Sequence, residues 1–205
     1  MIKLLWFALC FCLLSCNQIQ VNKIAIQPYG NFNSAIVDTV KSTLEQVYGV
    51  EVVVLAPSDL PQSAFINIKS PRYRADSLIQ ILRREKPDSV DCVIGLTNLD
   101  ISTTKTDQWG NIKEPESKYG DWGVFGLGYR PGASCVVSTH RIQNSDYKLF
   151  ISRFKKICMH EIGHNLGLKH CTDGKTCVMR DAAEKISTVD GVELELCETC
   201  WARIN

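Results

Sequence analysis

Apolar and polar positions in the first hundred residues alternate between two periods. Short apolar, often β-branched runs predict strands at residues 24–27, 50–55, 65–68 and 90–96. Between them, apolar residues recur at helical spacing over residues 36–47, a helix that Gly49 closes. A second helical pattern follows Pro71 over residues 75–82 and stops at Pro87. Strands that alternate with helices predict an α/β layer with a mostly parallel sheet.

The next stretch of the chain loses this periodicity. Residues 98–123 are polar and rich in Asp, Lys, Thr, Gly and Pro, and predict a long surface connection. Residues 124–129 and 134–139 then predict two strands around a turn at 130–133. A strand beside an active site can pair with an extended peptide at the sheet edge, although a purely structural hairpin explains the pattern equally well. The sequence does not say which strand is the free edge.

A long helix that begins near Tyr147 separates apolar from charged positions. At 100° per residue, one side carries Phe150, Phe154, Ile157, His160, Glu161 and His164. The opposite side carries Lys148, Ser152, Lys155 and Lys156. The face with the two histidines is therefore predicted to point inward.

The end of this helix has the spacing of a zinc site. His160 and His164 are four residues apart, so both imidazoles can reach one metal ion. Glu161 lies about 100° further round the helix, where it can act as a general base on a water at the metal. On a straight helix His170 would lie about 9 Å beyond His164. His170 can return to the metal only if the helix stops, and Gly167 can adopt the left-handed conformation that ends helices.

The alternative is that these histidines only pack or face solvent. Three of the four histidines in the chain, however, fall within residues 160–170 together with the Glu and the Gly at the required places. This concentration favours the metal site over the alternative.

The N-terminus resembles an export signal. Lys3 precedes an apolar run over residues 4–14 that is too short to span a membrane. The run ends in Leu-Leu-Ser-Cys, which resembles the lipobox of bacterial lipoproteins, so Cys16 is the predicted lipidated N-terminus. A generic signal peptide is the alternative. A lipid on Cys16 would hold the protein to a membrane surface of the bacterial cell envelope.

The remaining sequence predicts one domain. Residues 16–205 suit a single domain with a sizeable core, divided into an N-terminal part at 20–167 and a C-terminal part at 168–205. The formal net charge is +1 and no basic block stands out, which argues against nucleic acid as a partner. We expect a monomer.

The ten cysteines sort into groups by position. Cys10 and Cys12 lie in the signal, and Cys92, Cys135 and Cys158 occur singly in apolar surroundings, where a buried thiol is expected. Four follow the helix: Cys171, Cys177, Cys197 and Cys200. They match a four-thiolate zinc site, although an exported protein could instead form two disulfides. The two cysteines of a CxxC pair can form a disulfide only with strained geometry, but they can bind one metal ion without strain. This favours a metal site.

The whole motif resembles the archaemetzincins, a branch of the metzincin zinc peptidases. The matching residues are HExxHxxGxxHC at 160–171, Cys177-x-Met179 and CxxC at 197–200. The resemblance implies a catalytic zinc on His160, His164 and His170, with Glu161 as general acid and base. It implies a structural zinc on the four cysteines, two zinc ions per chain, and Met179 as the Met-turn beneath the catalytic metal. The spacing from Cys171 to Cys177 is one residue longer than the family pattern, and Gly174 is placed to absorb the difference.

The resemblance also implies a fold and an activity. The fold is a twisted mixed sheet with helices, an active-site helix and a small C-terminal zinc-binding subdomain. The activity is hydrolysis of peptide bonds in a peptide or protein substrate, by a zinc-bound water and the Glu161 base. One alternative is a lipid-anchored zinc-binding or interaction protein without turnover, which the intact Glu161 argues against. Another is a metal-dependent amide hydrolase that acts on cell-wall peptides.

Some metzincins carry a tyrosine two residues after the Met-turn methionine. In this sequence Asp181 occupies that position, so a further oxyanion donor must come from elsewhere. Tyr129 and Arg130 are the candidates that the sequence offers.

Overall fold

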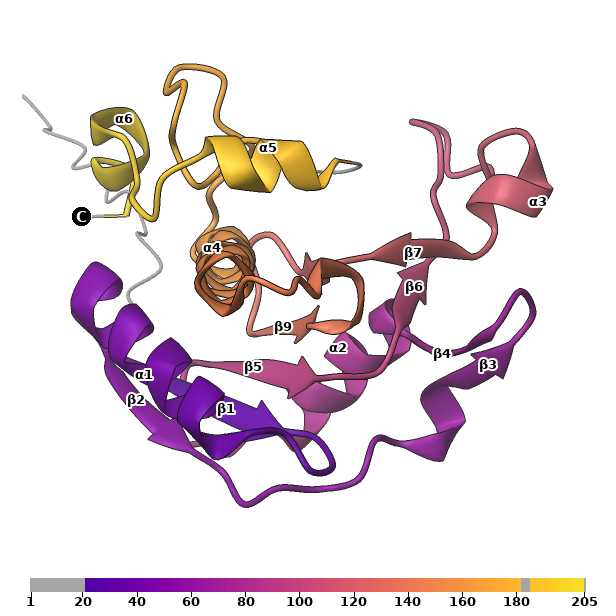
Figure 1. Cartoon of the computed structure of the whole chain (residues 1–205), viewed down its shortest axis with the longest axis horizontal. Helices are drawn as coiled ribbons and strands as arrows, with labels where there is room; N and C mark the ends of the chain where they lie inside the picture. Colours follow the sequence, from indigo (N-terminus) through magenta and orange to yellow (C-terminus); the bar gives the residue numbers. More distant parts are fainter. Residues whose placement is uncertain (1–20, 182–184, 205) are drawn as a thin grey trace, which may run out of the picture.

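A five-stranded sheet forms the centre of the computed structural model, which describes residues 21–181 and 185–204 (Figure 1). Its strands, in spatial order, are β2 (Glu51–Val54), β1 (Lys23–Pro28), β5 (Cys92–Thr97), β9 (Ser134–Ser138) and β8 (Gly126–Gly128). The first four are parallel and β8 is antiparallel to β9. The predicted mixed, mostly parallel sheet is confirmed, and β8 is one of its two edges.

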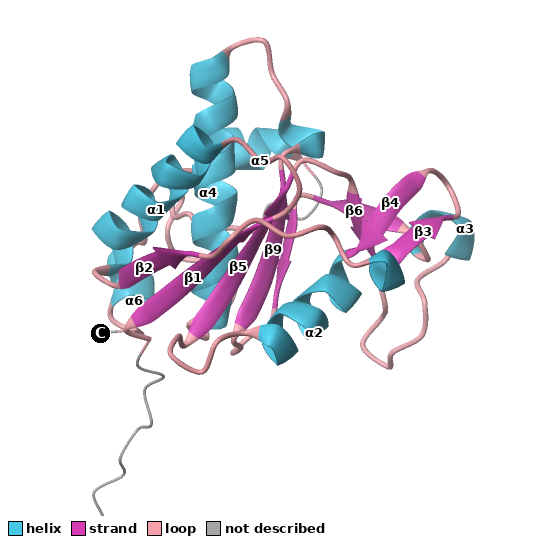
Figure 2. Cartoon of the chain, turned by 90° about the horizontal axis from the view of Figure 1, so that it is seen from below, coloured by secondary structure: helices cyan, strands magenta, loops and turns pink. Residues whose placement is uncertain are grey.

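Helices cover both faces of this sheet (Figure 2). One face packs against α1 (Ser34–Tyr48) and α4 (Tyr147–Asn165), and the other packs against α2 (Ala75–Glu85). The alternation of side chains along β1 divides the core, because Ile24 and Ile26 join the first cluster and Ala25 joins the second. Every residue of β5 is buried, as expected for a parallel strand with helices on both sides.

Local sequence sets the helix ends. The Asn33 side chain accepts hydrogen bonds from the first backbone amides of α1, and the Asp146 side chain does the same for α4. Gly49 ends α1 with a φ of +67°, as the sequence predicted. The helix that presents the histidines therefore starts and stops where its own residues specify.

A second, four-stranded sheet lies beside the first. Its order is β3 (Phe65–Asn67), β4 (Pro71–Arg74), β6 (Ile101–Thr103) and β7 (Trp122–Val124), and the helices η1 (Gln62–Ala64) and α3 (Glu116–Tyr119) belong to its connections. The predicted long surface connection over 98–123 is correct for its exposed middle, but the prediction missed β6 and β7 at its two ends, and it missed β4. The predicted strand 124–129 is split, because β7 and β8 belong to different sheets.

Buried charges explain why the hydrophobic pattern missed this sheet. Arg72 lies 3.3 Å from Asp100 and 3.5 Å from Asp121, and all three side chains are almost fully buried. Asp100 also accepts hydrogen bonds from Arg141, which lies in the short helix η2 (His140–Ile142). Strands of three or four residues that are joined by ion pairs show no periodic pattern of apolar residues, so the sequence pattern could not predict them.

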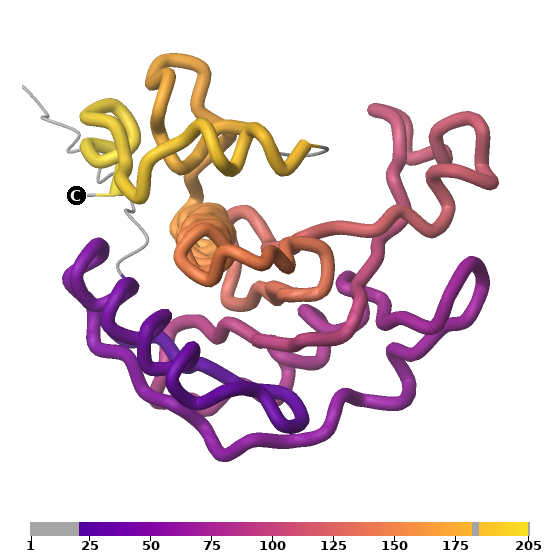
Figure 3. Tube along the Cα trace, viewed as in Figure 1, coloured from indigo at the N-terminus to yellow at the C-terminus, as the bar shows by residue number. Residues whose placement is uncertain are grey.

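The chain beyond α4 forms the small C-terminal part that the resemblance implied (Figure 3). It contains α5 (Ile186–Gly191), α6 (Glu198–Trp201) and the four cysteines. Asp190 of α5 accepts two hydrogen bonds of 2.7 Å from Arg153 of α4. Lys156 of α4 donates to the Val189 carbonyl at 3.1 Å. These contacts fix α5 against the active-site helix.

The predicted signal peptide and Cys16 lie outside the described residues. Within residues 21–181 and 185–204, no helix is both long and apolar enough to cross a membrane. The single cysteines Cys92, Cys135 and Cys158 are buried free thiols, as predicted.

Candidate active site

The chain reverses immediately after α4. Gly167 has a φ of +92°, and its amide donates to the His164 carbonyl at 2.9 Å. The Leu168 amide donates to the Gly163 carbonyl at 2.9 Å, which completes the Schellman pattern of a helix C-terminus. Because a side chain at this φ would be strained, a glycine is needed here. The sequence predicted this helix end.

Three imidazoles converge after the reversal. One ring nitrogen from each of His160, His164 and His170 lies within 4.8 Å of the other two. The Nδ1 atoms of His160 and His164 donate to the carbonyls of Val178 and Leu168 at 2.9 and 2.8 Å. These bonds fix the tautomer and leave Nε2 as the nitrogen that can bind a metal. The arrangement has the ligand type and spacing of a zinc site with three protein ligands.

The protonation state of His160 and His164 is suitable for binding a metal ion. Burial, then the neighbouring His164, lowers the pKa of His160 to about 4. Burial also lowers the pKa of His164. Neutral imidazoles are the form that binds a metal, so neither ring has to lose a proton near neutral pH.

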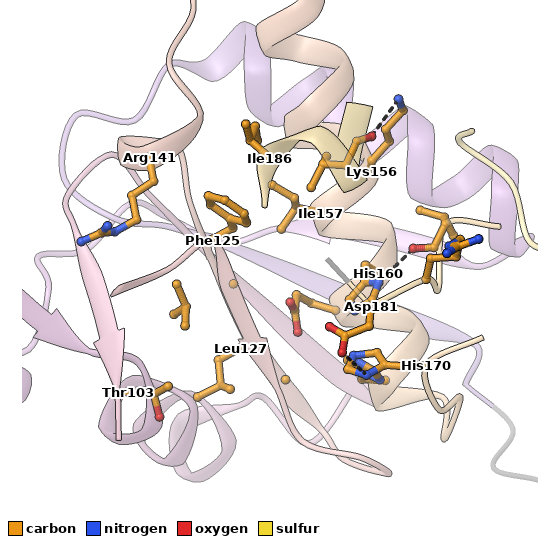
Figure 4. Close-up of a pocket in the computed structure, with 18 of the residues that line it drawn as sticks. Thr103, Phe125, Leu127, Arg141, Lys156, Ile157, His160, His170, Asp181 and Ile186 are labelled. Atoms are coloured by element: carbon orange, nitrogen blue, oxygen red, sulfur yellow. Dashed lines mark hydrogen bonds and ion pairs between the residues drawn. The ribbon is translucent and has the colours of Figure 1, made fainter. Parts of the chain in front are cut away.

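Asp181 is a residue of the site whose role the sequence did not reveal. Its Oδ2 lies 3.6 Å from Nδ1 of His170, and the two side chains lie next to each other in the cavity (Figure 4). A carboxylate beside a metal-binding histidine can orient the ring. Its position two residues after Met179 is the only sequence signal that could have indicated this contact.

Glu161 is buried against the edge strand. A Cβ at Gly126 would lie 2.8 Å from Cγ of Glu161, and one at Gly128 would lie 3.2 Å from Oε2. The two glycines of β8 therefore leave the space in which the carboxylate lies. Burial raises the pKa of Glu161 from 4.5 to about 8. Sequence reasoning missed both glycines, although glycine inside a predicted strand often marks a close approach.

Met179 lies under the histidine-bearing turn of α4. The side chain is fully buried, and a Cβ at Gly163 would overlap its sulfur. The Met179 carbonyl accepts a hydrogen bond of 2.8 Å from the amide of Cys171. The glycine inside the HExxH motif thus makes room for the methionine.

The four C-terminal cysteines form a second cluster. Their sulfur atoms all lie within 4.8 Å of one another, and those of Cys171 and Cys197 are 3.6 Å apart. A tetrahedral zinc with Zn–S bonds of about 2.3 Å requires sulfurs about 3.8 Å apart, whereas a disulfide requires about 2.05 Å. The described cysteines form no disulfide in this structure, and the spacing of their sulfurs has the geometry of a four-thiolate chelate.

Burial and backbone amides have opposite effects on the thiols of this cluster, and burial prevails at Cys177 and Cys200, where it raises the pKa. The amide of Gly174 donates to Sγ of Cys171 at 3.3 Å, and that of Cys197 donates to Sγ of Cys177 at 3.4 Å. Burial opposes ionisation of Cys171, but the amides of Gly174 and Asp173 bring its pKa down to about 7. A thiolate is the form that binds zinc.

A cavity of about 580 Å³ connects these elements to solvent. The three histidines, Glu161 and Asp181 line it, and so does the edge strand β8. Its apolar wall includes Phe125, Ile157, Ile186, Val189 and Val192.

Two sequence predictions near the cavity need correction. Lys156 lines the cavity and does not lie on the opposite face of α4, because it is four residues before His160 and so lies on the same face of the helix. Its ammonium group donates to the Val189 carbonyl of α5. Tyr129 is not among the lining residues and packs into the core on the α2 side. Arg130 does not line the cavity either, but it lies near the site, because its charge adds to burial in lowering the pKa of His164.

These features define a metal-dependent hydrolase with a metzincin-like fold. They are a helix with an HExxH motif, a glycine turn that brings a third histidine back to the first two, and a buried carboxylate in an open cavity. The sequence model of Peptidase family M54 matches residues 16–205. The archaemetzincin of Halobacterium salinarum (strain ATCC 29341 / DSM 671 / R1) is 32% identical over 187 residues, which cover 87% of this chain and 96% of that protein.

Solved structures agree with this match. The crystal structure of archaemetzincin from Methanopyrus kandleri has a TM-score of 0.72 and 28% identity, and the alignment covers 90% of this chain and 93% of that one. The structure of archaemetzincin from Archaeoglobus fulgidus complexed with malonate has a TM-score of 0.68 and 29% identity, with 89% and 99% covered. The chain belongs to peptidase family M54, the archaemetzincins, and is a zinc metallopeptidase.

Proposed function

We propose that the catalytic zinc is held by the three converging histidines and that Glu161 is the general acid and base. We further propose that a second, structural zinc is held by the four C-terminal thiolates, so that each chain binds two ions. The convergence of three imidazoles beside a buried carboxylate, inside an open cavity, supports the catalytic assignment most strongly. An interaction protein without turnover would need neither the carboxylate nor the cavity.

When bound, zinc supplies a Lewis acid that acidifies a water and polarises the scissile carbonyl. The residues of this chain supply the rest of the chemistry. The Glu161 carboxylate accepts the proton of the attacking water and returns it to the nitrogen of the leaving amine. Its buried position against Gly126 and Gly128 holds the carboxylate in one place for both transfers. The carbonyls of Val178 and Leu168 keep the protons of His160 and His164 on Nδ1 throughout.

The edge strand β8 is the proposed docking site for the peptide. β8 pairs with β9 on one side, and its residues line the cavity. An extended peptide can add to such an edge through backbone hydrogen bonds. Gly126 and Gly128 carry no side chains that would keep the peptide backbone away, which favours this mode of binding.

Removal of zinc tests the proposed function. Purified protein is expected to contain two zinc ions per chain and to cleave members of a peptide library. A strong chelator should abolish cleavage, and added zinc should restore it. The reason is that the chain's own residues cannot lower the pKa of a water molecule to near 7, as a bound metal ion does. Cleavage that persists in metal-free protein would contradict the catalytic assignment. A zinc content that does not change when Cys197 and Cys200 are replaced would contradict the structural one.

We also propose that the protein is a lipoprotein of the bacterial cell envelope, anchored through Cys16. The apolar run and the lipobox-like end of residues 4–16 support this proposal. Expressed with its native N-terminus, the protein is expected in the membrane fraction, and Cys16→Ser should release it or leave its signal uncleaved. Identical fractionation and mass of both proteins would refute the anchor.

A further inference from the structure

The hairpin of β8 and β9 is attached to the end of α4 by a buried side chain. Asn165 is the last residue of α4 and is fully buried. Its Nδ2 donates to the carbonyls of Tyr129 and Ser134, each at 2.9 Å. Tyr129 directly follows β8 and Ser134 begins β9, and the Tyr129 amide donates to the Ser134 carbonyl at 3.3 Å. The Asn165 side chain therefore bridges both strands at the point where their pairing ends.

Packing alone does not explain an asparagine at this position. A side-chain amide nitrogen has two N–H donors, and both are used here. Within residues 21–181 and 185–204, no group donates a hydrogen bond to the Asn165 Oδ1. A buried acceptor without a partner lowers stability, and a leucine of similar size would not have this disadvantage. What leucine could not do is hold the two carbonyls of the hairpin.

Glu161 and Asn165 attach β8 to α4 at two points. The two residues are four apart in the helix, which is one turn or about 6 Å along its axis. A Cβ at Gly128 would lie 3.0 Å from the Glu161 carbonyl, and Asn165 holds the next residue, Tyr129. A single contact would allow the strand to pivot on the helix. Two contacts fix both the distance and the direction of β8 relative to α4.

The backbone groups of β8 that a peptide can pair with lie at these contacts. The Phe125 carbonyl and the Tyr129 amide both form hydrogen bonds to β9. Because alternate residues of an antiparallel pair share these bonds, the amides and carbonyls of Gly126 and Gly128 point away from β9, toward the free edge. A shift of β8 relative to α4 would therefore move a docked peptide relative to Glu161.

We propose that Asn165 is a positioning residue of this peptidase, which aligns the peptide on β8 with Glu161 and the three histidines. The inference rests on the proposed function, because it takes β8 as the docking strand. Asn165 does not line the cavity, so it contacts no peptide there. It acts through the carbonyls of Tyr129 and Ser134.

Two inhibitors separate alignment from stability. Acetohydroxamate binds a catalytic zinc but is too small to reach along β8, whereas a peptidyl hydroxamate built on a cleaved library peptide engages the zinc and β8 together. For zinc-loaded Asn165→Leu we expect unchanged affinity for acetohydroxamate and at least tenfold weaker binding of the peptidyl hydroxamate, because its two halves no longer fit at once. The kcat for the matching peptide should fall at least tenfold, because the bound peptide is misplaced.

Ser134→Ala is the matched control. It removes the 2.7 Å hydrogen bond from the Ser134 hydroxyl to the Ile79 carbonyl, which ties the same hairpin to α2 on the other face of the sheet. The Ser134 carbonyl keeps its bond to Asn165. This variant should lose stability in denaturant unfolding, but its affinities for the two hydroxamates should keep the wild-type ratio.

Gly132→Ala disturbs the same junction from the turn and keeps the test decisive if Asn165→Leu folds poorly. A Cβ at Gly132 would lie 2.2 Å from that of Tyr129, so the Tyr129 carbonyl must move relative to Asn165. This variant should also weaken binding of the peptidyl hydroxamate alone.

The outcomes distinguish this inference from the proposed function. A wild-type ratio of the two affinities in Asn165→Leu and Gly132→Ala would overturn the inference and leave the proposed function standing. An equal loss of that ratio in Ser134→Ala would also overturn it, because Asn165 would then act only through the stability of the hairpin. A wild-type protein that cleaves no peptide of the library would overturn both.

Discussion

Glu161→Gln is expected to lower kcat/KM by about 10²–10⁴-fold, the range that a general acid and base contributes. The amide has nearly the shape of the carboxylate but cannot accept the proton of the attacking water. The histidine nitrogens do not depend on Glu161 for orientation, because Val178 and Leu168 hold two of the rings. Zinc content and the circular dichroism spectrum should therefore match those of the wild-type protein. Activity within a fewfold of wild type would rule out Glu161 as the base.

The same substitution should change stability with a defined pH dependence. In the metal-free protein, burial raises the pKa of Glu161 from 4.5 to about 8. The folded state then binds the proton more tightly than the unfolded state, so the wild-type protein loses stability as the pH rises from about 4.5 to 8. Metal-free Glu161→Gln protein should be more stable than metal-free wild type at pH 8 by more than ~1 kcal/mol, and the difference should shrink toward pH 4.5. Denaturant unfolding at both pH values measures this.

The variant Gly126→Ala tests whether activity depends on the position of the Glu161 carboxylate and not only on its presence. In Gly126→Ala the new Cβ would lie 2.8 Å from Cγ of Glu161, so the flexible side chain must shift while the fold persists. A displacement of this kind is expected to lower kcat by about 10- to 100-fold. Gly191→Ala is the matched control, because a Cβ there meets nothing within 4 Å. Equal activity of the two variants would show that the close approach of β8 is unimportant.

The second large effect is expected from the thiolate cluster. The double variant Cys197→Ser, Cys200→Ser should contain one zinc ion instead of two and lose at least ~3 kcal/mol of unfolding free energy, because the binding free energy of a structural zinc contributes directly to folding. Zinc analysis and denaturant unfolding measure the two quantities. Cys92→Ala removes a buried thiol outside the cluster and serves as the control, with zinc content unchanged. A double variant that retains two zinc ions would contradict the assignment.

This variant should also lose activity, because the two sites share backbone segments. His170 directly precedes Cys171, and the Val178 carbonyl that holds His160 directly follows Cys177. The amide of Cys171 also donates to the carbonyl of Met179, under the histidines. If the thiolate cluster comes apart, His170 and Val178 lose their supports together. We therefore expect a loss of kcat of at least tenfold even when the catalytic site is saturated with zinc.

The central fold and the metal-binding motif could be read from the sequence because both depend on local spacing. Buried strands and amphipathic helices impose periods that persist over five to fifteen residues, and the strands and helices of the main sheet appeared where those periods indicated. The spacing of His160 and His164 is a property of one helix, and Gly167 ends that helix through its own backbone conformation.

Tertiary structure determined three features that the sequence did not reveal. These are the small sheet, the edge position of β8 and the contacts that orient the site. Strands such as β6 and β7 are three residues long and depend on ion pairs between Arg72, Asp100 and Asp121. The periodicity of apolar residues along the chain does not indicate such ion pairs. The fit of Glu161 against Gly126 likewise joins segments 35 residues apart. By itself the sequence determined which residues can bind zinc and move a proton, because helical geometry fixes their spacing. Only the folded chain decided what surrounds them and where a peptide can lie, because those contacts exist only after distant segments pack together.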